Sequence, residues 1–314
     1  MPEKPFLDEA TRPDDILAAY RWIVGRDPGS KAEIDRLARD YPTRAELRAF
    51  VLRTKGSLHE HLKSRFGAEK WVLAEVLDGK RMWLNLVDRH VSMGCLVGVW
   101  EPDETRFVRA TLKPGQTFVD VGANLGWFSL VASECVGPAG RVHAFEPQAR
   151  IFPYLARTIA ENGLLGRILP YEMALSDHWG SGEMAWSPTS ANTGRAWLTP
   201  VPSPTGSLGV VRVGVLDDIM AGVRVDFLKV DVEGAEGLVL RGARRILKES
   251  RPVVMIELLP ARLPQISRVP VETIFDLFCD LGYRGFAIGA DGLGPPMGTW
   301  PQDRSELNLA FLPQ

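Results

Sequence analysis

Asp120 is followed by two glycines, Gly122 and Gly126, in the stretch DVGANLG, which joins an apolar run of strand length to a helical pattern. Glycine has no Cβ, so the backbone can turn sharply there and approach a ligand closely. The N-terminus of the following helix presents unpaired N–H groups to an anionic group such as a carboxylate. A tight turn between a strand and a helix, without a ligand, is the structural alternative.

The order of residues in this loop distinguishes two kinds of cofactor. Dinucleotide sites carry G-x-G-x-x-G at this place, whereas this chain has D-x-G-x-N-x-G, with Asn124 between the two glycines. The acid at the front of the loop would repel a pyrophosphate, but it favours a cationic amino group or a sulfonium. The loop therefore favours S-adenosylmethionine over NAD as the cofactor.

Glu146 ends the next predicted strand, RVHAFEP, and stiff Pro147 follows it. An acidic residue about one strand after the glycine loop accepts the hydroxyl groups of a ribose in nucleotide-binding folds. A single Glu at the end of a strand would otherwise be a surface charge. Its position after the glycine loop makes Glu146 the predicted ribose-binding residue.

Lys229, Asp231 and Glu233 alternate in the run KVDVEGAE at the end of a further apolar strand. Side chains two positions apart point to the same face of a strand, so we expect these three ionisable groups on one face. Buried charges are costly unless they serve one another or a ligand, and the cluster is therefore a candidate reaction site. A structural salt-bridge cluster is the alternative, and Glu236 is expected to stabilise the start of the next helix.

Methyl transfer from a sulfonium is an in-line displacement, in which positioning and the exclusion of water provide most of the acceleration. An alcohol acceptor also loses a proton, so a base is expected within hydrogen-bond reach. The candidates at the ends of strands are Asp231, Glu233 and Glu257. Lys229 could orient a carboxylate or, if buried and neutral, act itself, and His178 is either a further base or an exposed loop histidine. No ligand spacing indicates a metal, so no metal is predicted.

Strands and helices alternate from residue 113 to the C-terminus. The predicted strands are TFVDVG, RVHAFEP, ILPYEMAL, VDFLKVD, PVVMIEL, YRGFAI and ELNLAFLP, and the predicted helices are 127–136, 148–162, AEGLVLRGARRILKE and VETIFDLFCDLG. This alternation predicts a parallel sheet with helices on both faces. The last strand follows its predecessor without a helix, so we expect it to run antiparallel. The Ser-, Pro- and Gly-rich insertion 177–208 is expected to be a substrate-covering loop or hairpin, with a surface excursion as the alternative.

The first part of the chain has a different pattern. Apolar residues recur at helical spacing in 14–62, and Thr43 followed by Glu46 is a capping box. The short apolar runs MWLNLV and CLVGVW indicate strands or an irregular lead-in to the core. We therefore predict a helical unit 1–68, a lead-in segment 69–112 that packs on the core, and a main domain 113–314.

The composition excludes several functional classes. The 314 residues include 37 Lys and Arg against 39 Asp and Glu, which gives a formal charge of −2. This balance provides no field to hold a polyanion, so nucleic acid is not an expected partner. Three widely separated cysteines indicate neither a zinc site nor a disulfide framework. The start is polar and no apolar run approaches about 18 residues, so we expect neither a secretory signal nor a membrane span, and a cytoplasmic location.

The runs FVDVGANLGWFSL, VHAFEP, LSD, VLDDI and LKVDVEGAE, in this order, resemble the FkbM-type methyltransferases from about residue 101 to the C-terminus. The resemblance implies an α/β, Rossmann-like class I methyltransferase with a seven-stranded, mostly parallel sheet, which O-methylates natural products or bacterial glycans. It places Asp231 and Glu233 at the reaction end. The residues onto which it carries cofactor binding are Glu101, Asp120, Gly122, Asn124, Gly126 and Glu146, with Ala174 or Leu175 beside the adenine.

We therefore predict a methyltransferase that uses S-adenosylmethionine to O-methylate a hydroxyl of a sugar, a glycan or another small metabolite. A nicotinamide-dependent oxidoreductase shares the fold and the ribose acid but lacks the third loop glycine. A non-catalytic glycan-assembly protein that keeps the cofactor fold has only the N-terminal helical unit in its favour. A nucleic-acid methyltransferase is disfavoured, because the chain has no Asn/Asp-Pro-Pro-aromatic tetrapeptide and no basic surplus.

Overall fold

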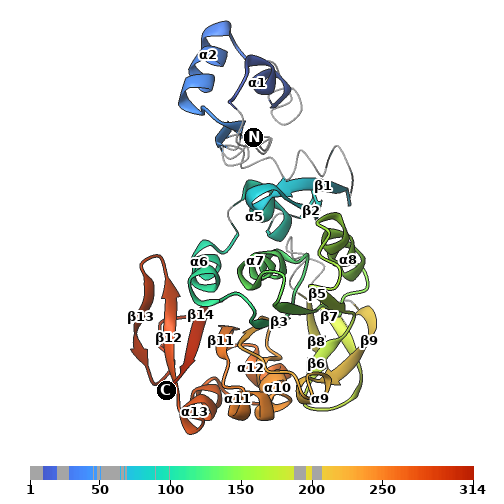
Figure 1. Ribbon diagram of the computed structural model, residues 1–314, viewed down its shortest axis with the longest axis vertical. Coiled ribbons are helices and arrows are strands. Elements are labelled where there is room, and N and C mark those ends of the chain that lie inside the picture. Colours follow the sequence, from blue (N-terminus) through green and yellow to red (C-terminus); the bar gives the residue numbers. More distant parts are fainter. Residues whose placement is uncertain are drawn as a thin grey trace. The chain divides into compact units, whose positions relative to one another are not determined.

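The computed structural model describes residues 10–19, 28–44, 46–47, 50, 64, 67, 69–88, 90–98, 100–186, 196–199 and 207–314. The chain divides into two compact units, Met1–Trp100 and Glu101–Gln314. Figure 1 labels the helices and strands of each unit. The division falls inside the segment 69–112 that the sequence suggests as a lead-in. The domain limits inferred from the sequence stay predictions about which parts fold independently.

Among its described residues, the first unit contains short helices and a hairpin. Its elements are α1 (Pro13–Ala19), α2 (Lys31–Asp40), β1 (Trp71–Val76), the 3-10 turn η3 (Leu77–Gly79), β2 (Lys80–Asn85) and α5 (Val91–Val97). Strands β1 and β2 pair antiparallel. The run CLVGVW does not form a strand: its first residues, Cys95 to Val97, end helix α5, and Gly98 closes that helix in the left-handed conformation.

Helix starts in this unit follow the expected chemistry. Ser30 caps α2 by accepting the N–H of Glu33 at 3.2 Å. Thr43 and Glu46 form the predicted capping box, in which each side chain accepts the backbone N–H of the other residue. The continuation of that third helix beyond residue 50 lies largely outside the described residues.

The second unit is built on an eight-stranded sheet. Its spatial order is β13 (Gly292–Met297), β12 (Tyr283–Gly289), β14 (Leu307–Pro313), β11 (Val253–Leu258), β10 (Phe227–Val230), β3 (Thr117–Val121), β4 (Arg141–Phe145) and β5 (Ile168–Tyr171). The five strands from β11 to β5 are parallel, and β14 runs antiparallel to both β11 and β12. The predicted mostly parallel sheet and its antiparallel last strand are confirmed. The eighth strand, β13, pairs with β12 at the edge and was not predicted.

Helices cover both faces of this sheet, as in a Rossmann-like α/β fold. They are α6 (Pro102–Thr111), α7 (Trp127–Val136), α8 (Phe152–Glu161), α9 (Leu216–Ile219), α10 (Glu236–Arg241), α11 (Arg244–Glu249), α12 (Leu263–Ile266) and α13 (Glu272–Asp280). Helix α7 spans the predicted residues, whereas α8 begins four residues later than expected. The predicted helix after β10 is divided into α10 and α11 at Gly242 and Ala243. A Cβ on Gly242 would lie 2.1 Å from the backbone oxygen of Ser176, so this position requires glycine.

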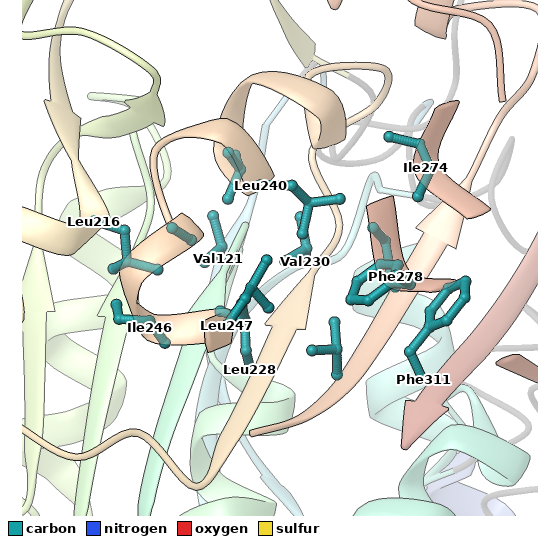
Figure 2. Close-up of a cluster of buried hydrophobic side chains, with 14 of the residues drawn as sticks. Val121, Leu216, Leu228, Val230, Leu240, Ile246, Leu247, Ile274, Phe278 and Phe311 are labelled. Carbon is teal, nitrogen blue, oxygen red and sulfur yellow. The ribbon is translucent and has the colours of Figure 1, made fainter. Parts of the chain in front are cut away.

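The two faces of β10 differ in chemistry. Figure 2 shows Leu228 and Val230 among apolar side chains of the helices that follow, including Leu240 and Ile246. These side chains are fully buried and form the main apolar core. Because successive side chains of a strand point to opposite faces, Lys229 lies on the other face, which α7 covers. The main core therefore lies against one face of the central strands, and a buried charge lies on the other.

A second, four-stranded sheet follows β5. Its order is β6 (Ala174–Ser176), β9 (Ser207–Val215), β7 (Gly180–Trp186) and β8 (Ala196–Thr199). The predicted strand ILPYEMAL is therefore two strands in different sheets, separated at Glu172 and Met173. The insertion 177–208 contains antiparallel strand pairs, so its hairpin form is confirmed over the described residues. That it covers a substrate stays a prediction.

Candidate active site

The glycine loop after β3 requires glycine for geometric reasons. Gly122 has φ +84°, and a Cβ there would lie 1.9 Å from the backbone oxygen of Asp231. Gly126 has φ +96°, and a Cβ there would lie 2.8 Å from Cδ1 of Leu155. A side chain at either position would be strained in the left-handed region and would also collide. The loops after β3 and β10 thus touch through their backbones.

Glu146 joins the glycine loop to the end of β4. Its side chain is buried, with Oε2 accepting the N–H of Asn124 at 2.9 Å and Oε1 accepting the N–H of Gln148 at 2.8 Å. Burial raises the pKa of Glu146 to about 7 against the lowering effect of these backbone donors. The side chain of Gln148 is a third hydrogen-bond donor to Glu146. An ionised carboxylate has about four acceptor sites, so acceptor capacity remains for a ligand hydroxyl. The structure brings the predicted ribose acid into contact with the predicted loop.

Asp120 lies inside the protein at the end of β3, with no exposed surface. Its Oδ2 accepts the hydroxyl of Ser129 on α7 at 2.7 Å, and its Oδ1 lies 3.7 Å from Nζ of Lys229. Burial raises the pKa of the Asp120 carboxyl, while Lys229 and Ser129 act in the opposite direction. The structure therefore places Asp120 beneath the loop, where its contacts are to protein groups.

Lys229 occupies the centre of this charged group. Its ammonium donates to Oδ2 of Asp231 at 3.1 Å and lies 5.1 Å from the centre of the Phe128 ring. Burial by itself lowers the pKa of Lys229, but the carboxylates of Asp231, Asp120 and Glu101 outweigh it and raise that pKa above its usual range. These contacts favour the charged form of Lys229, and with it the alternative in which Lys229 orients a carboxylate.

Asp231 also meets a second carboxyl group. Val230 pairs in register with Ile256 of β11, so the next residues along these parallel strands, Asp231 and Glu257, are neighbours. Glu257 is hydrogen-bonded to Asp231 and to Glu306. Burial, followed by the adjacent Asp231, raises the pKa of Glu257 to about 12. Glu257 therefore carries a proton at neutral pH, and a protonated carboxyl group is a hydrogen-bond donor.

Glu101 stands at the start of α6, with φ +41° in the left-handed region. Burial, followed by Asp231, raises the pKa of Glu101 to about 8, although Lys229 lowers it. Glu101 therefore belongs to the same electrostatic group as Asp120, Lys229 and Asp231. Three carboxyl groups, those of Asp231, Asp120 and Glu101, therefore act electrostatically on the one ammonium of Lys229.

Glu233 does not share a face with Lys229 and Asp231, which corrects the prediction from alternation. Strand β10 ends at Val230, and Glu233 lies in the following turn with φ +55°. Its Oε2 lies 3.8 Å from Nη1 of Arg262, which caps the start of α12. The alternation of side chains holds only while the chain stays extended, so the turn directs Glu233 to a different partner.

Three other residues that the sequence singles out, Glu236, Ala174 and Leu175, are buried. Glu236 is fully buried and accepts the backbone N–H of Gly234 at 2.9 Å and of Val232 at 3.3 Å, so it stabilises the turn into α10 as expected. Ala174 and Leu175 are buried in β6, which pairs with β9.

His178 contacts Asp177 in place of the carboxyl groups around Lys229. Its Nδ1 lies 2.9 Å from Oδ1 of Asp177, and Oδ2 of Asp177 accepts a hydrogen bond from Nε of Arg241 at 2.8 Å. The His178 side chain is 62% exposed. These contacts favour the interpretation of His178 as a loop histidine.

The structure adds four residues that the sequence did not single out. They are Phe128 and Ser129 on α7, Arg262 at α12, and Glu306 before β14. The helix pattern of GWFSL carries a weak signal for the first two, because Ser129 is a polar residue in an otherwise apolar run. No sequence signal identifies Glu306, since its contact depends on the pairing of β11 with β14.

Among the described residues, no group of three or more His, Cys, Asp or Glu residues is arranged to hold a metal ion. Within the same part of the chain, no helix has the length and apolar character needed to cross a membrane.

Comparison with known proteins identifies the family. The model of the methyltransferase FkbM domain matches residues 120–284. The methyltransferase sdnD of Sordaria araneosa is 29% identical over 206 residues, which cover 54% of this chain and 78% of that protein.

Two solved structures are similar at lower identity. A methyltransferase FkbM from Methylobacillus flagellatus is 19% identical with a TM-score of 0.41; the match covers 69% of this chain and 52%, about half, of that protein. An O-methyltransferase from Bacillus cereus, in complex with SAH, is 12% identical with a TM-score of 0.39, over 68% of this chain and 81% of that one. The family match covers the glycine loop, Glu146, and the charged strand end, and the chain belongs to the FkbM methyltransferases.

Proposed function

We propose that this methyltransferase uses S-adenosylmethionine to methylate a hydroxyl group of a sugar, a glycan or another small metabolite. The observation that carries the proposal is the excess of carboxyl groups around Lys229, next to the glycine loop. Asp231, Glu101 and Asp120 are three carboxyl groups beside one ammonium, and burial, followed by Asp231, raises the pKa of Glu101 to about 8. Such a region favours the sulfonium and ammonium charges of S-adenosylmethionine and disfavours a dinucleotide pyrophosphate.

The residues present fit this cofactor at both of its ends. Glu146 has acceptor capacity left for a ribose hydroxyl, and its hydrogen bond to Asn124 fixes the loop beside it. Glu101 and Asp231 would face the cationic end, and the resemblance puts Ala174 and Leu175 beside the adenine. Asp120 acts through Lys229, which it helps to hold.

The proposed chemistry needs positioning and removal of a proton. When bound, S-adenosylmethionine supplies an electrophilic methyl group. Asp231, with 28% of its side chain exposed, accepts the proton of the acceptor hydroxyl. The ammonium of Lys229 lies 3.1 Å from Asp231, and a neighbouring positive charge favours the ionised form of a carboxyl group. Glu233, held towards Arg262, positions the turn that follows Asp231, and the strands β7 to β9 of the insertion cover the acceptor.

The test combines binding with product analysis. Calorimetry should show binding of S-adenosylmethionine and of its demethylated product, and no comparable binding of NADH. Incubation with S-adenosylmethionine labelled at the methyl group and extracts rich in sugars and glycans should yield labelled products, whose methyl ethers mass spectrometry would locate. Binding of NADH at similar affinity, or label found only on nitrogen or carbon, would contradict the proposal.

A further inference from the structure

Gln148 lies two residues beyond Glu146, where the chain leaves β4 for helix α8. Its backbone N–H donates to Oε1 of Glu146 at 2.8 Å, and its carbonyl oxygen accepts the N–H groups of Ile151 and Phe152, both at 2.8 Å. Only 4% of Gln148 is exposed. The position of this residue is therefore fixed by hydrogen bonds within the protein.

The side-chain amide of Gln148 has one satisfied end and one unsatisfied end. The side chain donates to Glu146, and only the NH₂ end of an amide can donate. This contact fixes the orientation of the amide, because an ionised carboxylate accepts hydrogen bonds and donates none. Over the described residues, Oε1 at the other end of the amide is buried without a hydrogen-bond partner. A buried acceptor that lacks a donor costs free energy, which a ligand that supplies the donor recovers.

The hydrogen bonds of Glu146 show why a ribose needs a second acceptor. The carboxylate of Glu146 accepts the backbone N–H groups of Asn124 and Gln148, and also the side chain of Gln148. An ionised carboxylate has about four acceptor sites, so about one is left. A ribose carries two neighbouring hydroxyl groups, and each of them is a donor. One of these hydroxyls therefore requires an acceptor other than Glu146.

We propose that Oε1 of Gln148 accepts one ribose hydroxyl of S-adenosylmethionine, beside the hydroxyl that Glu146 accepts. The inference rests on the proposed function and adds a second ribose-binding residue to it. Because the NH₂ group of the amide contacts the carboxylate of Glu146, a sugar that reaches this carboxylate comes within reach of the amide oxygen. Both residues are buried, with exposures of 3% for Glu146 and 4% for Gln148, and a hydrogen bond is electrostatically stronger there than in water.

The other donors of S-adenosylmethionine fit this oxygen less well. The ammonium group belongs to the methionine end, for which Glu101 and Asp231 are the proposed partners. The adenine amino group lies on the side of the base that is remote from the ribose. A ribose hydroxyl is the donor that lies next to Glu146.

The test compares ligands that each lack one hydrogen-bond donor. Calorimetry at pH 9, above the pKa of about 7 to which burial raises Glu146, measures binding of the demethylated cofactor and of its forms that lack one or the other ribose hydroxyl. The wild type should bind each of these forms about tenfold more weakly, the size of one hydrogen bond. Gln148→Met keeps the length of the side chain without its amide. In this variant one of the two losses should disappear, and the other should remain because of Glu146.

Gln116→Met is the matched control. Gln116 precedes β3, at the opposite end of that strand from the glycine loop, and its Oε1 accepts the N–H of Lys113 at 2.8 Å. This variant should show both losses at their wild-type size. Gln148→Leu repeats the test with a second apolar side chain if Gln148→Met does not fold. The wild-type measurement needs no variant, and it requires that both hydroxyls contribute to binding.

The outcomes separate the role of Gln148 from the function on which it rests. The proposal is overturned by a wild type that is indifferent to either hydroxyl, and by a Gln148→Met variant that shows both losses at full size. Weaker binding of all forms by the same factor would show that Gln148 only positions Glu146. Reduced discrimination only against a form without the adenine amino group would overturn the assignment to the ribose. A wild type that does not bind the demethylated cofactor would contradict the proposed function itself.

Discussion

Replacement of Lys229 by methionine tests the idea that one buried ammonium balances the carboxylates beneath the glycine loop. Methionine keeps the length and apolar stem of lysine but removes its charge. Side-chain exposures of 5% for Lys229 and 1% for Asp120 mean that water screens neither group. Removing one partner of a buried ion pair costs about 3–5 kcal/mol, because the other charge stays buried without compensation. We expect a loss of free energy of unfolding in that range at pH 8.

The pH dependence of this loss has a definite sign. In the Lys229→Met variant, Asp120 keeps its burial and loses the cation that lowers its pKa, so its folded pKa rises well above the unfolded value of about 3.9. A group whose folded pKa is raised favours the folded state at low pH and loses that contribution as the pH rises. The variant should therefore be closer in stability to the wild type at pH 5 than at pH 8.

Urea unfolding followed by circular dichroism at both pH values measures these differences. The double variant Asp120→Asn/Lys229→Met removes the uncompensated charge and should be more stable than Lys229→Met alone at pH 8. Lys248→Met, at an exposed lysine of α11, is the control and should unfold near the wild-type midpoint. A loss below about 1 kcal/mol for Lys229→Met, or a double variant less stable than the single one, would refute the reasoning.

Three further changes test other parts of the structure. Glu146→Ala should weaken binding of the demethylated cofactor by about 1.5–3 kcal/mol in calorimetry, the loss expected for hydrogen bonds to a charged group, and unchanged affinity would remove Glu146 from the site. Because Glu101 has a pKa of about 8, affinity for S-adenosylmethionine should rise from pH 7 to pH 9 as its carboxyl ionises, and a Glu101→Gln variant that keeps the same rise would contradict this assignment. Gly242→Ala should destabilise the protein by about 1–3 kcal/mol, because its Cβ would lie 2.1 Å from the backbone oxygen of Ser176. Gly298→Ala is the control, because a Cβ at Gly298 meets no atom within 4 Å. Equal melting temperatures of the two variants would show that the backbone around Gly242 shifts to accept the methyl group.

The sequence by itself determined the α/β fold and the position of the cofactor loop. Apolar runs of strand length alternate with amphipathic helices, and local patterns of this kind lead directly to a parallel sheet. The glycines of the loop could be identified from the sequence, because a left-handed backbone conformation and the close approach of another backbone exclude other residues. The contact of Gly122 with the backbone oxygen of Asp231 is an example. Glu146 could be proposed as the ribose-binding residue because it lies at the end of the strand that follows the loop. The prediction of a single strand at ILPYEMAL was wrong, because the local sequence pattern does not show that its two halves pair in different sheets.

Only the tertiary structure decided which charges meet. The alternation of side chains along a strand predicted that Glu233 lies on the same face as Lys229 and Asp231. Strand β10 ends at Val230, however, and in the turn that follows Glu233 lies beside Arg262. The protonated state of Glu257 depends on a neighbour from a strand far away in the chain, and the contact of Glu257 with Glu306 depends on the antiparallel register of β11 and β14. Strand order and register are set by pairing between distant parts of the chain and by burial. The neighbours that this pairing brings to a carboxyl group determine its pKa, and therefore whether it is ionised.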